Sequence, residues 1–125
     1  MILETAALSE YRSRYPHEHK TVSIVESHLD QLQRDKQIAQ TNGHATGSAW
    51  VFNPNNGKVL LTLHKKLNRW LQLGGHMQVE DNDTIIQTAL REAKEESGIP
   101  EIKLTHNKLF HLDIHYIPPY RNEPE

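Results

Sequence analysis

Three glutamates, Glu92, Glu95 and Glu96, are the residues of this chain whose type and spacing best suit chemistry. Residues three and four apart on a helix are neighbours on its surface, so the three carboxylates would share a patch about one turn long. Each like-charged pair costs an isolated helix about 0.2–0.5 kcal/mol, and a divalent cation would reverse that sign. Oxygen ligands without cysteine or a compact histidine cluster favour Mg²⁺ or Mn²⁺ over zinc. The alternative is a solvated helix face on which Arg91 pairs with Glu95.

The segment that carries these glutamates, from about Asp83 to Ser97, is predicted to be an amphipathic helix. Its apolar residues recur at the offsets of one helical stripe, namely Ile85, Ile86, Ala89, Leu90 and Ala93. We expect the N-cap among residues 81–83, and a stop at Gly98, which precedes Ile99-Pro100. One face of the helix should therefore be buried, and the other should carry the carboxylates.

A glycine pair, Gly74-Gly75, stands upstream of this helix. The string from Gly74 to Ile99 closely resembles the signature box of the Nudix hydrolases, and the matched positions of its helical half are Arg91, Glu92, Ala93, Glu95, Glu96, Gly98 and Ile99. Seven matched positions with an upstream Gly-Gly form a specific signal. The loop between the two halves is two residues longer than is usual in the family. Trp70 extends the resemblance upstream, because family members commonly have a tryptophan at about this distance before the glycines.

The resemblance implies a metal site and its chemistry. Glu92, Glu95 and Glu96 would bind Mg²⁺, with Mn²⁺ as a substitute, and the carbonyl of Gly75 would be a further ligand. Either Glu92 or Glu95 would serve as the general base that activates water. The reaction expected is Mg²⁺-dependent hydrolysis of the diphosphate bond in a nucleoside diphosphate linked to another group. The alternative is a Nudix-like module that binds a nucleotide or a metal without hydrolysing it.

Arg91 is expected to have a structural role. Asp83 stands eight residues before it, where the family has a glutamate that commonly pairs with this arginine. Glu80 is the competing partner. We expect Arg91 to hold the loop against the helix by pairing with Asp83 and Glu95.

Basic residues before the glycines are candidates for phosphate binding. Lys65, Lys66 and Arg69 lie in one short stretch, and His76 follows the glycine pair. Ammonium and guanidinium groups are natural partners of phosphate oxygens. The alternative is an ordinary solvated loop.

The remaining segments are expected to build the scaffold. Residues 1–40 read as helical, with a break at Tyr15-Pro16 and an amphipathic helix over residues 17–37. This helical segment should cover one face of the sheet or form a dimer interface. Residues 44–52 and 58–64 are predicted to form a hairpin around the turn-rich stretch 53–57.

Two further strands are predicted over residues 101–105 and 110–116. Alternation in the second would place His111, Asp113 and His115 on one face, where they would bind a metal or substrate. The alternative is a half-exposed strand showing its polar side.

Composition narrows the class of protein. The chain has 125 residues, enough for one domain, and a net charge of −2, which argues against a nucleic-acid binder. Cysteine is absent, which excludes thiol catalysis. No apolar run is long enough to span a membrane, so a cytoplasmic protein is expected.

The resemblance implies a mixed α/β (α+β) fold. We expect a Nudix-like α/β/α sandwich with a mixed sheet over residues 43–125, preceded by a helical segment at 1–42 that packs on it. Family members usually have further strands and a closing helix after the box, so the C-terminal portion of the sheet is expected to be short. Exposed strand edges would then favour a homodimer.

Overall fold

The computed structural model describes residues 5–35, 43–78 and 83–115, and the account of the fold concerns these residues. Two N-terminal helices, α1 (Thr5–Arg14) and α2 (His19–Arg34), are connected through Tyr15 and the short 3-10 helix η1 (Pro16–Glu18). The break predicted at Tyr15-Pro16 is confirmed, because the fixed φ of proline suits the first position of the new helix. Helix α2 matches the amphipathic helix predicted for this region.

Six short strands follow the helices and pair in three antiparallel sets. They are β1 (Thr46–Ala49), β2 (Val51–Phe52), β3 (Val59–Leu60), β4 (Thr62–His64), β5 (Arg69–Leu71) and β6 (Leu73–His76). Strand β1 pairs with β6, β2 with β3, and β4 with β5. The mixed α/β class is confirmed. Among the described strands every pairing is antiparallel, so the parallel pair that a mixed sheet includes is not among them.

The six strands belong to three continuous stretches of chain, 46–52, 59–64 and 69–76, and each stretch changes its partner at one residue. These residues are Trp50, Leu61 and Gln72. Residues 46–49 pair with the third stretch, whereas Val51 and Phe52 pair with the second. The second and third stretches also pair with each other, through β4 and β5. Each stretch therefore contacts both of the others, and the predicted hairpin of 44–52 with 58–64 is limited to two residue pairs.

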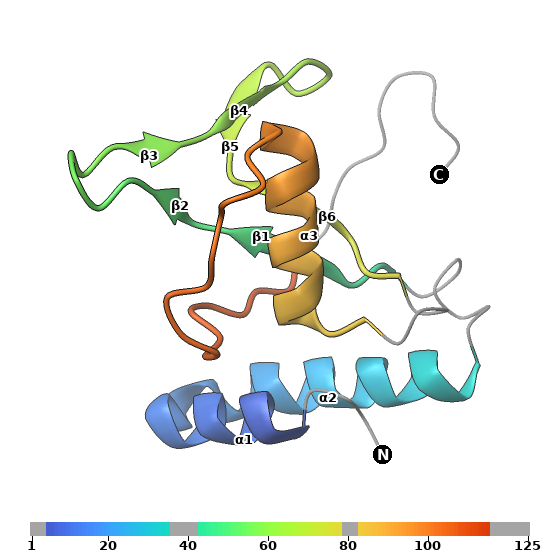
Figure 1. The fold of residues 1–125 in the computed structure, drawn as a ribbon. Coiled ribbons are helices and arrows are strands. Elements are labelled where there is room, and N and C mark those ends of the chain that lie inside the picture. The colour runs from blue at the N-terminus through green and yellow to red at the C-terminus, as the bar shows by residue number, and fades with distance from the viewer. Residues whose placement is uncertain (1–4, 36–42, 79–82, 116–125) are drawn as a thin grey trace.

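Helix α3 (Ile85–Ser97) carries the candidate active-site residues and packs against β1 and β6 (Figure 1). Its N-cap is Thr84, whose side chain accepts a hydrogen bond from the amide of Gln87 in a capping box. The expectation of a cap at Asp83 was wrong, because that carboxylate is engaged by other donors, and residues 81–82 lie outside the described residues. The helix ends as predicted at Gly98, whose φ of +71° is left-handed.

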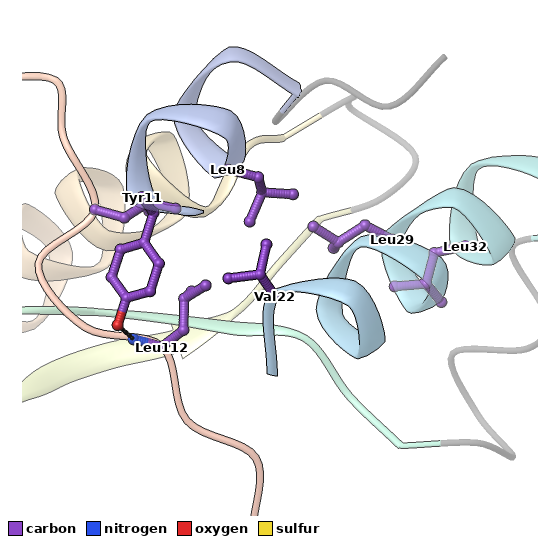
Figure 2. Close-up of a cluster of buried hydrophobic side chains, with 7 residues drawn as sticks. Leu8, Tyr11, Val22, Leu29, Leu32 and Leu112 are labelled. Carbon is purple, nitrogen blue, oxygen red and sulfur yellow. Dashed lines mark hydrogen bonds between the residues drawn. The ribbon is translucent and has the colours of Figure 1, made fainter. Parts of the chain in front are cut away.

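The main apolar core lies between the N-terminal helices and a segment that follows α3. Figure 2 shows its members around Leu8, Val22 and Leu29. Helices α1 and α2 contribute Leu8, Tyr11, Val22, Leu29 and Leu32, and the later segment contributes Leu109 and Leu112. Residues more than 90 positions apart thus share one core, which joins the N-terminal helices to the chain beyond the Nudix-like box.

Residues 101–115 contain no strand, which corrects the two strands predicted there. Their backbone groups are bound by side chains of α1 instead. The amide of Leu112 donates to the Tyr11 hydroxyl at 3.2 Å, shown as a dashed line in Figure 2, and the carbonyl of Leu109 accepts from Arg14. Leu112 is buried while Phe110 and Ile114 are exposed, so the alternation expected for residues 110–116 does not determine burial.

Candidate active site

The Glu92 carboxylate lies directly against the backbone of Gly75. A Cβ atom added at Gly75 would overlap all three atoms of that carboxyl group. The absence of a side chain at Gly75 therefore opens the space that the carboxylate occupies. The side chain of Glu92 is only 19% exposed, so its position is largely set by the strand beneath it.

The Glu96 carboxylate reaches the neighbouring glycine. Its Oε1 atom accepts a hydrogen bond from the backbone amide of Gly74 at 3.0 Å. Glu92 and Glu96 are one helical turn apart, so their carboxylates can contact the two consecutive glycines of β6, one at each glycine. The structure thus brings two of the three predicted glutamates onto the glycine pair.

Glu95 is placed differently. It is exposed, and within the described residues its side chain forms no hydrogen bond or ion pair. Nor do any three histidine, aspartate or glutamate side chains converge closely enough to hold a metal ion in that part of the chain. The three glutamates therefore share a helix, but only Glu92 and Glu96 are held at the strand.

Helix α3 approaches the strands closely because of a glycine that the sequence patterns did not single out. Gly47 is the register partner of Gly75, and a Cβ atom there would lie 2.6 Å from the carbonyl oxygen of Ile85 and 2.9 Å from the amide nitrogen of Ala89. No side chain fits between strand and helix at this point. A glycine inside a strand is the signal that indicates such an approach.

Arg91 connects the start of the helix to the glycine strand. It forms an ion pair with Asp83, donates to the carbonyl oxygen of His76 at 3.1 Å, and lies 3.6 Å from an oxygen of Glu92. The expected pairing with Glu95 is replaced by Glu92. The hydrogen bond with Asp83 raises the pKa of Arg91, and the negative charges of Glu92 and Glu95 add to this effect. Glu80, the competing partner, lies outside the described residues.

Asp83 is the most heavily engaged carboxylate of the site. Besides Arg91, it accepts a hydrogen bond from the amide of Gln78 and lies 3.1 Å from the hydroxyl of the buried Thr88. Burial by itself raises the pKa of Asp83, but the hydrogen bonds from Arg91, Gln78 and Thr88 outweigh it, so the pKa is below its ordinary value. Asp83 is therefore ionised at neutral pH and anchors the entry to α3.

The candidate phosphate-binding residues are spread over the strands. His76 follows the glycine pair, and its ring packs against that of His44 at 5.0 Å between centroids. Arg69 begins β5, and Lys66 lies in the turn between β4 and β5. The structure therefore places only His76 next to the glycines of β6.

The three polar residues predicted on one strand face after α3 do not form a site. His115 contacts Asp113 at 2.9 Å, in a pair that is exposed on both sides. His111 is exposed and outside that pair, because no regular strand holds the three residues on one face.

Together, the glycine pair of β6 and a helix whose carboxylates reach its backbone place two acidic side chains at one strand. Residues 42–124 match the NUDIX domain family. Because the match covers most of the chain, the protein belongs to the Nudix family. No curated protein and no solved structure shows a significant match. In the described part of the chain, no helix is long and apolar enough to cross a membrane.

A divalent cation is implied by the family, and the chemistry of the residues fits it. The groups at the glycine pair are carboxylate oxygens and backbone carbonyls, which hard ions such as Mg²⁺ prefer. Because Gly75 has no side chain, the Glu92 carboxylate can lie against the backbone. In Glu96, Oε1 accepts the hydrogen bond from the Gly74 amide, and the other carboxylate oxygen does not take part in that bond. These oxygens would hold the ion beside β6.

Proposed function

We propose that this protein hydrolyses the diphosphate bond of a nucleoside diphosphate linked to another group, with Mg²⁺ as cofactor. Membership in the Nudix family supports pyrophosphohydrolase chemistry in general. The observation that carries the proposal is the pair of carboxylates, Glu92 and Glu96, held against the backbone of Gly75 and Gly74. On a helix face that is simply solvated, the carboxylates would extend into water and would not contact two consecutive glycines.

The proposed ligands of the ion are Glu92, Glu96, Glu95 and the carbonyl oxygen of Gly75. When bound, Mg²⁺ neutralises charge on the diphosphate and lowers the pKa of the attacking water. The chain itself supplies the positioning. The amide of Gly74 fixes one oxygen of Glu96, and the contact with Arg91 restrains Glu92.

The general base is proposed to be Glu92 or Glu95, and their surroundings distinguish them. Glu92 is half-buried against the strand, whereas Glu95 is exposed to solvent. A pH-rate profile of Glu92→Gln and Glu95→Gln separates the two roles. Loss of the base removes the acidic limb of the profile, while loss of a ligand alone raises the Mg²⁺ concentration needed for activity.

Phosphate contacts are proposed for His76, Lys66 and Arg69. His76 is supported by its place directly after the glycine pair. Arg69 is exposed at the start of β5, in the same stretch of chain that continues into the glycines. Substitution of His76 or of Arg69 should raise KM for a diphosphate substrate more than it lowers kcat.

The decisive test is a panel of nucleoside diphosphate derivatives, assayed with Mg²⁺ and with Mn²⁺ for wild-type protein and Glu96→Gln. We expect turnover by the wild type and a loss of about 100-fold or more in the variant, because a neutral amide is a poor ligand for a hard ion. Glu101→Gln, which removes an exposed carboxylate just after α3, is the matched control and should keep full activity. Equal activity of all three proteins would refute the metal assignment.

A second candidate function is nucleotide binding without hydrolysis, for which a complete set of metal ligands is not required. In the described residues, no third acidic or histidine side chain joins Glu92 and Glu96 in a cluster that could hold a metal. Calorimetry distinguishes the two functions. Mg²⁺ binding that Glu96→Gln abolishes, without turnover of any substrate, would identify a binding module.

A further inference from the structure

In the pair β1–β6, helix α3 covers one of the two faces. Gly47 and Gly75 point at the helix, as the atoms that a Cβ would meet show. Ser48 and Gly74, the next pair in the same register, meet each other on the opposite side. Since successive residues alternate between faces, the register extends this opposite side along all three stretches of chain.

The exposed large apolar residues of this opposite side, here called the strand face, are Trp50, Phe52, Val59, Leu63 and Trp70. Phe52 is the register partner of Val59, and Leu63 is the register partner of Trp70. All five side chains are exposed, Trp50 by 54% and Trp70 by 65%. Figure 1 shows the strands β2 to β5 extending away from the N-terminal helices, with α3 on one side of them.

The strand face carries no charged side chain. Arg69 is the one Lys, Arg, Asp or Glu residue in the described strands, and its register partner is His64. Alternation places this pair on the side opposite to Leu63 and Trp70. The largest apolar patch that a soluble monomer exposes is often a binding surface.

We propose that the strand face binds the strand face of a second copy of this chain. A two-fold interface brings each patch against itself, so it must be self-complementary. An uncharged apolar patch satisfies this condition without like-charge repulsion, whereas a charged partner would find no opposite charge on the patch. Aromatic residues, which form half or more of this surface, are enriched at the centres of interfaces.

The size of the strand face sets the strength of the association. A fully covered aromatic side chain buries about 150–250 Å². The three aromatic side chains of the strand face are about half exposed, so together with the two aliphatic ones they expose roughly 500 Å² of apolar surface per copy. Two copies would bury roughly 1,000 Å², the lower limit for a specific interface. The dimer should therefore be weak, with a Kd on the order of micromolar.

Both tryptophans of the chain lie on the strand face, so tryptophan fluorescence reports on this face alone. Sedimentation velocity over a concentration series should show the 14.5 kDa monomer giving way to a species of twice that mass. Tryptophan emission should shift to the blue with the same midpoint. A monomer at all concentrations, or a mass change without a change in emission, would overturn the proposal.

Variants distinguish association through the strand face from non-specific association through any exposed apolar side chain. Trp70→Ser and Leu63→Ser should each weaken the dimer about tenfold or more. Phe110→Ser is the matched control, because Phe110 is 73% exposed but lies outside the strands, and it should leave the dimer unchanged. All three side chains are exposed in the single chain, so folding should be retained, as circular dichroism would verify. Equal behaviour of the three variants, or open-ended aggregates in place of dimers, would refute a closed two-fold interface.

Discussion

Two regions of this molecule are packed by different means. Between α3 and the pair β1–β6, the contact depends on missing side chains, since Gly47 and Gly75 let backbone and carboxylates approach. Between the N-terminal helices and residues 109–112, the contact depends on large side chains such as Tyr11 and Leu32. The first region determines where the carboxylates lie. The second buries most of the fully covered apolar residues.

The apolar core therefore provides most of the stability, whereas the glycine contact determines the geometry of the site. Burying a leucine or a tyrosine stabilises a fold by about 1.5–3 kcal/mol per side chain, whereas a glycine contact contributes mainly shape. The site helix contacts this core through the partly buried Ile85 and Ile86 at its start, but it contributes none of the buried members of the cluster. Its own polar anchors are the pair Asp83–Arg91 at its start and the hydrogen bond from the Gly74 amide to Glu96 near its end.

The largest effect should follow a change in the apolar core. Leu32→Ala should lower the free energy of unfolding by about 2–5 kcal/mol, because it leaves a cavity in the cluster. The Mg²⁺ affinity of the molecules that remain folded should not change. Urea unfolding and calorimetry measure the two quantities. A parallel loss of Mg²⁺ affinity would show that the two regions are not separable.

The two paired glycines provide the sharpest test of the other region. In Gly47→Ala the new methyl group meets backbone atoms of α3, which cannot move aside, so we expect a loss of about 1–3 kcal/mol in stability. In Gly75→Ala it meets the end of the flexible Glu92 side chain, so stability should change by less than about 1 kcal/mol. Activity should nevertheless fall at least about tenfold, because the carboxylate is displaced. We assign to Gly47 the close approach of α3 to the strand, and to Gly75 the position of the Glu92 carboxylate. The same response from both variants would contradict this assignment.

The polar anchor should give a pH-dependent effect. The folded-state pKa of Asp83 is depressed, so its contribution to stability is present above its ordinary value of 3.8 and is lost as the pH falls through the folded-state pKa. Asp83→Asn should cost about 1–3 kcal/mol at neutral pH. Below pH 3.8 the difference from wild type should shrink. A constant difference across this range, measured by urea unfolding, would show that ionisation of Asp83 does not matter.

The most local effect should come from the loss of a single hydroxyl in the core. Tyr11→Phe removes the donor to Glu18 and the acceptor for the Leu112 amide, at a cost of about 0.5–1.5 kcal/mol for each net hydrogen bond. Amide exchange at Leu112 should become faster, while exchange in α3 should not. Faster exchange throughout α3 would indicate that the two regions open together.

The helices were predictable from sequence because their signals are local. The apolar spacing of α2 and α3 and the glycine stop at Gly98 depend on residues within a few turns of each other. The pairing of Arg91 with Asp83 was implied by the resemblance, because the family has a carboxylate eight residues before this arginine. The cap at Thr84 was missed because a competing use of Asp83, by Arg91 and the Gln78 amide, is not visible in local patterns.

Long-range contacts decided what the sequence could not predict. Residues 110–116 alternate like a strand, yet Tyr11 and Arg14 of α1 bind the backbone at Leu112 and Leu109. A side chain about a hundred residues away thus replaces the strand pairing. The roles of Gly47 and of the Gly74 amide likewise depend on a helix that approaches from another part of the chain.

The exchange of partners at Trp50, Leu61 and Gln72 has a consequence for how this chain can vary. Each stretch is registered against both others, so the three registers depend on one another. A residue inserted at one of these three positions would shift two pairings at once and reverse the faces of the side chains beyond it. An insertion in the turns at 53–57 or 65–68 would leave all three pairings intact. Changes in length should therefore be tolerated in the turns and rejected at the three residues where the strands exchange partners.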